Sequence, residues 1–112
     1  MSILEKIQAN DITNLHISDA DDQLLDNSHK LIEALENNTS ITSVRFDTDF
    51  LGCLRSDARS KIVKVVGKTP SLQEVHLEDA LLMVVEFSDL LFKATSLRVL
   101  KLPNVVLMLP LI

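Results

Sequence analysis

A short pattern recurs four times in the 112-residue chain and constrains the fold more than any other feature. Each copy has an aliphatic residue at its first and fourth positions and an aliphatic residue or phenylalanine at its sixth. The copies are ITNLHI (12–17), ITSVRF (41–46), LQEVHL (72–77) and LRVLKL (97–102). Positions four and six lie two residues apart, which is the period of a strand with one buried face. Each copy therefore predicts a short strand.

The segments that lead into the later strands repeat as well. Each carries apolar residues at offsets of three and four, the stripe of an amphipathic helix. These sets are Leu31, Ala34 and Leu35; Ile62, Val65 and Val66; and Phe87, Leu90 and Leu91. A serine stands directly before each later strand, at Ser40, Ser71 and Ser96, and indicates a turn. The repeated unit is thus predicted to be strand, loop, helix and turn.

With this unit the sequence resembles the leucine-rich-repeat family, specifically the long intracellular repeats of the ribonuclease-inhibitor and tropomodulin kind. Stretches such as LIEALENNTSITSVRF (31–46) and TPSLQEVHLEDALL (69–82) carry the resemblance, which covers essentially the whole chain. It implies an α/β fold, a short solenoid wound as a right-handed βα superhelix. About four parallel strands would line its concave face and helices its convex face. The family's loop asparagine is replaced here by Ala20, Asp49, Ala80 and Val105, so the repeats are divergent.

Length and repeat positions predict a single leucine-rich-repeat domain over residues 1–112. Residues 1–11 are expected to form an N-terminal helical cap, with Ser2 as N-cap and Ile3, Leu4 and Ile7 placed over the first strand. Repeats start at residues 12, 41, 72 and 97, and the last repeat is incomplete.

The chain ends on the apolar segment NVVLMLPLI (104–112). It aligns without a gap with the segment after the third strand, where Leu82 matches Leu107 and Met83 matches Met108. The segment is therefore expected to be the loop after the fourth strand, and it is too short to cross a bilayer. It forms a candidate edge for self-association into a homodimer through Val105, Val106, Leu107, Leu109, Leu111 and Ile112.

Residues between the buried strand positions are expected to face solvent on one side of the sheet. The fifth positions form a mainly basic row, and the positions beyond the strands form an acidic one. The candidate protein-binding residues are His16, Ser18, Arg45, Asp47, Glu74, His76, Glu78 and Lys101. Such rows suit recognition of a charged protein partner, or they neutralise each other as a solvated face; the sequence leaves both interpretations open.

The resemblance implies a non-catalytic protein-interaction or scaffold module that binds a protein partner through its concave strand face. Two alternatives stay open. The chain is a structural fragment of a longer leucine-rich-repeat protein that self-associates through its apolar C-terminal edge, or it is a tropomodulin-like actin-capping module. Residues 31–46, which carry the tropomodulin likeness, contain no actin-binding motif.

Motifs for catalysis, cofactor binding or metal binding are not found in the sequence. His16 and His76 lie two strands apart, about 9 to 10 Å, which is too far for both to bind one zinc ion. Cys53 lies among apolar residues in LGCL (51–54), and we expect it to be a small buried hydrophobic residue rather than a nucleophile. We therefore expect no enzymatic activity, no cofactor and no metal.

Charge is unevenly distributed along the chain. Residues 1–40 carry a balance of −6 and residues 41–112 a balance of +1, which gives the net charge of −5. A basic group, Arg55, Arg59, Lys61, Lys64 and Lys68, surrounds the second predicted helix. The acidic balance and the absence of Trp and Tyr argue against nucleic-acid binding.

A single cysteine and the lack of a signal peptide predict a cytoplasmic protein that does not associate with membranes.

Overall fold

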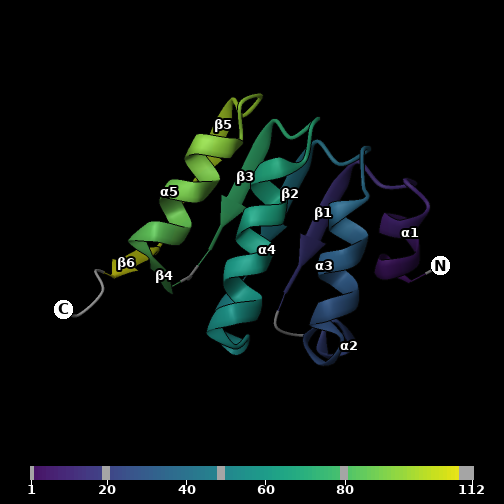
Figure 1. The fold of residues 1–112 in the computed structure, drawn as a ribbon, viewed down its shortest axis with the longest axis horizontal. Helices are drawn as coiled ribbons and strands as arrows, with labels where there is room; N and C mark the ends of the chain where they lie inside the picture. Colours follow the sequence, from purple (N-terminus) through teal and green to yellow (C-terminus); the bar gives the residue numbers. More distant parts are fainter. Residues whose placement is uncertain (1, 19–20, 48–49, 79–80, 109–112) are drawn as a thin grey trace.

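The computed structural model describes residues 2–18, 21–47, 50–78 and 81–108, in which helices alternate with short strands (Figure 1). The helices are α1 (Ile3–Gln8), α2 (Asp22–Asp26), α3 (Ser28–Glu36), α4 (Ser56–Lys68) and α5 (Val84–Lys93), with a 3-10 turn, η1 (Leu51–Cys53). The strands are β1 (Asn14–Ile17), β2 (Ser43–Phe46), β3 (Glu74–Leu77), β4 (Leu81–Met83), β5 (Val99–Lys101) and β6 (Val106–Met108). The predicted α/β class is confirmed.

Four strands form one parallel sheet in the order β1-β2-β3-β5, the order in which they occur in the chain. In the register Leu15 lies opposite Val44, Val44 opposite Val75, and Val75 opposite Leu100. These residues are the fourth positions of the four sequence copies. The strand register that the repeated pattern predicts is therefore confirmed.

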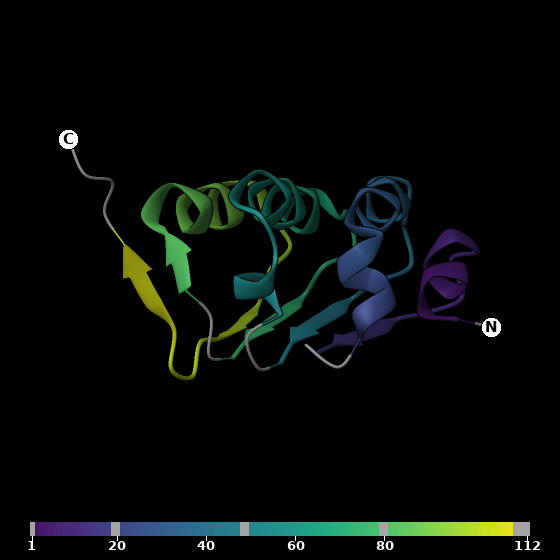
Figure 2. The same cartoon turned by 90° about the horizontal axis from the view of Figure 1, so that it is seen from below.

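The helices and the sheet form two layers (Figure 2). Helices α3, α4 and α5 lie side by side over one face of the sheet, and α4 contacts both of its neighbours. Among the described residues no helix covers the opposite face, which we call the open face. Strand side chains alternate between buried and accessible positions, as Leu15 and Ile17 alternate with Asn14 and His16.

The core lies between the two layers, where the sheet meets the apolar stripes of the helices. Leu31, Ala34 and Leu35 of α3 and Ile62, Val65 and Val66 of α4 are all buried, as their spacing predicts. In α5 the prediction succeeds only in part, because Leu90 is buried but Leu91 is 47% exposed. Helix α4 packs against one side of α5. Leu91 is exposed because no described helix packs against α5 from the other side.

The N-terminal helix α1 begins with a capping box. Ser2 Oγ accepts a hydrogen bond from the Glu5 N–H (3.2 Å), and Glu5 Oε1 accepts one from the Ser2 N–H (3.5 Å). Ile7 is buried, and α1 packs mainly beside α3. The buried Asn38, at the end of α3, donates from Nδ2 to Ile7 O (3.0 Å) and fixes α1 to the following unit.

Each serine that precedes a later strand bonds to the backbone of the unit before it. The three bonds run from Ser40 Oγ to Ile12 O (2.6 Å), from Ser71 Oγ to Thr39 O (3.1 Å) and from Ser96 Oγ to Leu72 O (2.7 Å). These bonds connect consecutive units at the turn that enters each strand. They lie at the opposite end of the strands from the loops in which the family's asparagines would stand.

The apolar C-terminal segment forms a strand where a loop was expected. Strands β4 and β6 pair in parallel as a small second sheet, with Leu82 opposite Leu107 and Met83 opposite Met108. Residues that match in the gap-free sequence alignment therefore lie opposite each other in the structure. Their burial differs, because Leu82 is 1% exposed and Leu107 is 42% exposed, while Val105 is half-buried. Leu109, Leu111 and Ile112 lie outside the described residues.

Candidate functional site

The fifth positions of the four sequence copies form one row across the open face. His16 pairs with Arg45, Arg45 with His76, and His76 with Lys101 in the parallel register. The side chains of His16, Arg45 and Lys101 are 58%, 47% and 59% exposed, whereas that of His76 is 20% exposed. The parallel ladder thus places four basic or titratable side chains on adjacent strands.

A second row stands where the strands end. Ser18, Asp47 and Glu78 directly follow β1, β2 and β3. The ladder continues through them, because the Asp47 N–H donates to Ile17 O (2.8 Å) and the Glu78 N–H donates to Phe46 O (3.0 Å). Asp47 and Glu78 therefore occupy equivalent positions on neighbouring strands, directly beside the first row.

Acids and bases of the open face pair with each other across the strands. Asp47 lies at the centre, with His16 Nε2 2.5 Å from its Oδ2 and Arg45 Nε 2.5 Å from its Oδ1. Arg45 Nη2 also lies 3.6 Å from Glu78 Oε2, and Lys101 Nζ lies 3.6 Å from Glu74 Oε1. Exposed pairs of this kind contribute little to stability, because solvent screens them. Their arrangement matches the self-neutralising interpretation, although each pair stays accessible to a binding partner.

The network alters the protonation of its central residue. The hydrogen bond from Arg45 lowers the pKa of Asp47 to about 2, and the hydrogen bond from His16 acts in the same direction. The same contact with Asp47 raises the pKa of the Arg45 guanidinium. Asp47 is therefore a fixed negative charge near neutral pH.

A third grouping on this face was missed by the sequence analysis, which weighed His16 and His76 as a zinc pair but did not consider this set. Asp47, His76 and Glu78 each offer one ligand atom, and these atoms lie within 4.8 Å of one another. His76 Nε2 is buried and has no hydrogen-bond partner among the described residues. The sequence held a usable signal, because Asp47 and Glu78 hold the same repeat position and His76 precedes Glu78 by two residues.

A buried charged pair between α4 and α5 was also missed. The Glu86 side chain is 2% exposed and accepts hydrogen bonds from Arg59 Nε (3.2 Å), Ser60 Oγ (2.7 Å) and the Met83 N–H (2.8 Å). These donors satisfy the carboxylate within the protein. We assign this cluster a structural role, because it joins α4 to the beginning of α5.

Cys53 is exposed, so the expectation that it is buried is wrong. It lies at the end of η1, where Leu51 and the following Leu54 take the buried positions. The tight 3-10 turn directs those two leucines inward and leaves Cys53 accessible. A lone cysteine without an adjacent base does not make a nucleophilic site.

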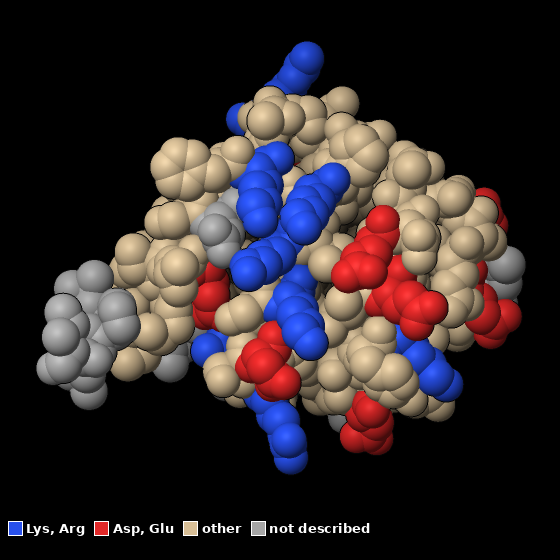
Figure 3. Space-filling model, in the orientation of Figure 1, with Lys and Arg blue, Asp and Glu red and all other residues tan. Residues whose placement is uncertain are grey.

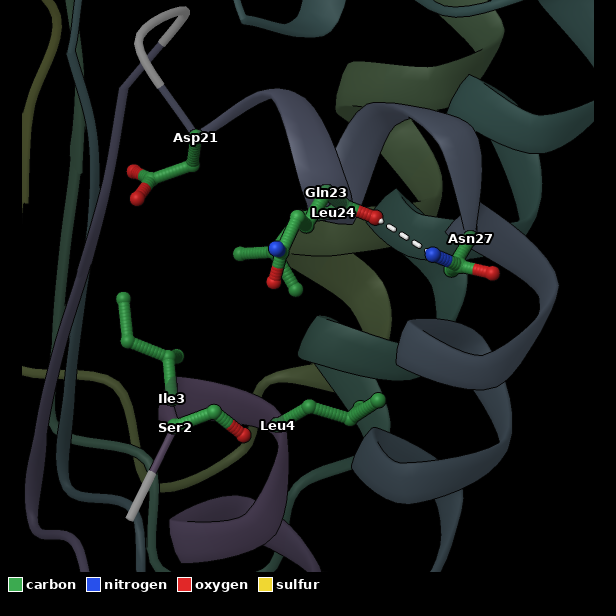
Figure 4. A pocket seen from close by; sticks show the side chains of 7 residues that line it. All are labelled: Ser2, Ile3, Leu4, Asp21, Gln23, Leu24 and Asn27. Carbon is green, nitrogen blue, oxygen red and sulfur yellow. Dashed lines mark hydrogen bonds between the residues drawn. The ribbon is translucent and has the colours of Figure 1, made fainter.

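A pocket of about 460 Å³ opens between α1 and α2 (Figure 4). Ile3 and Leu24 contribute apolar walls. Its polar groups are bonded locally, because Asp21 Oδ2 accepts from the Ser18 N–H (2.8 Å) and Asn27 Nδ2 donates to Gln23 O (2.9 Å). No set of polar atoms converges on the cavity, so the pocket gives no indication of a particular ligand.

Basic side chains form a band along the solvent face of α4 (Figure 3). Lys61, Lys64 and Lys68 follow the helical period on that face and are exposed, as is Arg55 just before the helix. Arg59 does not belong to this band, because it turns inward to Glu86. The basic group that the sequence places around this helix is therefore divided between a solvated face and a buried contact.

Exposed apolar side chains concentrate in the last part of the described chain. Among the residues whose burial is described, the exposed large hydrophobic ones are Val85, Leu91, Phe92, Val99, Val106, Leu107 and Met108. They belong to α5, β5 and β6, which lie together at one end of the molecule (Figure 1). This end is a second candidate surface, which meets the open face at β5.

Comparison with known proteins gives no match to this chain, whether among protein-family models, curated proteins or solved structures. Among the described residues, no helix combines the length and the apolar character that crossing a membrane requires.

Proposed function

We propose that this chain is a small leucine-rich-repeat solenoid whose function is to bind a protein partner through the open face of its sheet. Four parallel strands in chain order, helices on one face and serine bonds between consecutive units support the repeat assignment. The module acts as a scaffold and carries out no chemistry itself.

The observation that carries the proposal is the row of four aligned side chains on a sheet face that no described helix covers. Arg45 and Lys101 offer exposed cations. Arg45 is paired with Asp47 and Lys101 with Glu74, and an acidic group of a binding partner can replace either carboxylate. Charged rows of this kind set the specificity and the rate of association more than the affinity. A partner with a complementary acidic segment fits this face.

Affinity capture with two matched double variants tests this proposal. Arg45→Ala with Lys101→Ala removes cations from the open face, whereas Lys61→Ala with Lys64→Ala removes the same number from α4. We expect proteins that bind the wild type to bind the α4 variant equally and the open-face variant at least fivefold less. The opposite pattern, loss only in the α4 variant, would refute the open face as the binding surface.

A second candidate function is self-association through the apolar end. It is favoured by the exposure of Phe92 (83%), Val106 (57%) and Leu107 (42%), which lie on α5 and β6 at the same end of the molecule. Exposed apolar groups of this extent usually contact another protein surface. An isologous contact between two copies would cover both ends at once.

Light scattering across a concentration range checks the second candidate. We expect the apparent mass to rise toward that of a dimer for the wild type and to stay that of a monomer for Phe92→Glu with Leu107→Asp. A strictly monomeric wild type at high concentration would rule out self-association and leave the protein-partner proposal in place.

A further inference from the structure

Three side chains on the open face come together in a way that protein binding alone does not explain. The carboxylates of Asp47 and Glu78 and the imidazole of His76 are half-buried, and their ligand atoms lie within 4.8 Å of one another. His76 lies within β3, whereas Asp47 and Glu78 directly follow β2 and β3. The Asp47 N–H donates to Ile17 O and the Glu78 N–H donates to Phe46 O, so backbone hydrogen bonds hold both residues where the strands end.

His76 Nε2 provides an independent observation that points to a ligand. The atom is buried and has no hydrogen-bond partner among the described residues. It lies 3.9 Å from Glu78 Oε2, which is beyond hydrogen-bond distance. Buried polar atoms in folded proteins are nearly always hydrogen-bonded, so this nitrogen lacks a partner. A cation that binds both nitrogen and oxygen would supply one.

We propose that Asp47, His76 and Glu78 bind a divalent transition metal ion, for which zinc is the best match. Imidazole and carboxylate ligands together suit zinc, whereas calcium and magnesium prefer oxygen ligands alone. Tetrahedral zinc brings its ligand atoms to about 3.4 Å from one another, so shifts of roughly 1 Å close the site. Water takes the fourth position.

Arg45 competes with the metal ion for the same carboxylates. Its Nε lies 2.5 Å from Asp47 Oδ1, and its Nη2 lies 3.6 Å from Glu78 Oε2. A metal ion bound to these carboxylates would lie close to the Arg45 guanidinium. The two positive charges would repel each other, so metal binding must displace Arg45. The Arg45 side chain is 47% exposed and can turn toward solvent. Arg45 therefore holds the carboxylates together without metal and weakens metal binding.

His16 has a supporting role at this site. Its Nε2 lies 2.5 Å from Asp47 Oδ2 and fixes the carboxylate from the neighbouring strand β1. Carboxylate ligands of metal ions are themselves commonly hydrogen-bonded in this way. The position of Asp47 is thus set from both sides before a metal ion arrives.

Titration of the untagged full chain with zinc chloride tests the site without any protein partner, so its result is independent of the proposed function. After removal of metal with a chelator, calorimetry should show one equivalent of zinc bound. We expect His76→Ala to weaken binding at least tenfold, and Glu78→Gln to do the same. His29→Ala, which removes an exposed histidine on α3, is the matched control and should keep the wild-type affinity.

The Arg45→Gln variant gives a result that adventitious binding does not predict. Removal of the competing guanidinium should tighten zinc binding at least threefold. An unchanged or weaker affinity in this variant would overturn the proposal. So would zinc binding that both ligand variants leave unchanged, or that Cys53→Ser abolishes. Circular dichroism verifies the fold of each variant, and Glu78→Gln decides the question if His76→Ala does not fold.

Discussion

The carboxylate of Asp47 connects the first two strands of the sheet through side chains as well as through the backbone. It contacts His16 from β1 and Arg45 from β2, and Arg45 extends the contact to Glu78 beyond β3. Three strands thus share one set of charges. Because this set lies on the open face, its protonation affects both stability and any surface chemistry there.

Acid should weaken the wild type more than the Asp47→Asn variant. The pKa of Asp47 is lowered to about 2 in the fold from an ordinary 3.8, so the unfolded chain takes up this proton at higher pH than the folded chain. The stabilisation is complete above about pH 4 and is lost as the pH falls toward 2. The groups that face Asp47 are Arg45, His16 and Glu78.

Urea denaturation in the presence of a chelator, at about pH 6, 4 and 3, measures this difference. Other carboxylates take up protons in both proteins. The decisive quantity is therefore how much more steeply the free energy of unfolding falls with decreasing pH in the wild type than in the variant. Equal slopes for the wild type and the Asp47→Asn variant would show that the contact with Arg45 does not stabilise the folded state.

Replacement of Glu86 by alanine should destabilise the protein by about 3 kcal/mol, because it leaves buried donors without an acceptor. Arg59, Ser60 and the Met83 N–H all donate to this carboxylate, whose side chain is only 2% exposed. The free energy of unfolding from urea titration tests this. Glu33→Ala, at an exposed position of α3, is the control and should cost less than about 0.5 kcal/mol. Similar losses in the two variants would contradict the structural role of Glu86.

At the level of single residues, the sequence predicted positions better than contacts. The alignment of His16, Arg45, His76 and Lys101 follows from their common position in the repeat, because a parallel ladder places equivalent positions of successive strands side by side. The pairing of Glu86 with Arg59 depends on how two helices approach each other, which no local pattern encodes. The exposure of Cys53 was mispredicted because the direction of a side chain in a 3-10 turn does not follow the hydrophobicity of its neighbours.

Among the elements, the turn from α3 into β2 is held by the hydrogen bonds of a single side chain, Asn38. Asn38 Oδ1 accepts from the Ser40 N–H (2.9 Å) and the Ile41 N–H (2.9 Å), while Nδ2 donates to Ile7 O (3.0 Å). Asn38 is 2% exposed. One buried amide therefore shapes the turn and holds the N-terminal helix in place.

Asn38→Ala should cost about 2 to 3 kcal/mol, since it leaves several buried backbone groups unpaired. The adjacent Asn37 is a matched control, because it is exposed and donates to Glu33 O (3.0 Å) within the neighbouring helix α3. We expect Asn37→Ala to change stability by less than about 0.5 kcal/mol. Thermal or urea unfolding of the two variants gives the comparison. Equal losses in the free energy of unfolding would show that the buried hydrogen bonds of Asn38 do not stabilise the fold more than the exposed bond of Asn37.

The sequence predicted the elements with a clear apolar period and missed β4 and β6. Helices α3 and α4 carry full apolar stripes, so their period is unambiguous. Strands β4 and β6 have three residues each within continuous apolar runs, where periodicity cannot separate strand from loop. Their pairing depends on two segments of neighbouring units lying in register, which only the assembled molecule provides.

For the whole molecule, stability should be highest in the middle of the sheet. Strands β2 and β3 have a paired strand on both sides, whereas β1 and β5 each pair on one side only. The C-terminal end also carries the exposed apolar residues of α5, β5 and β6. Local opening therefore costs less free energy at this end than at the centre.

Hydrogen exchange at low protein concentration tests this gradient. Amides of β2 and β3 should exchange at least tenfold more slowly than those of β5, which has half-buried or exposed residues throughout. Protection of β5 equal to that of β3 would indicate that the C-terminal end is covered by another surface. Repetition at high concentration separates self-association from intrinsic protection.

The serine bonds between units have an evolutionary consequence. Ser40, Ser71 and Ser96 each donate to a main-chain carbonyl, an atom that every residue possesses. A substitution in the accepting unit therefore leaves its acceptor unchanged, and only the serine itself has to be kept. Neighbouring units can diverge in their side chains while they continue to stack in register.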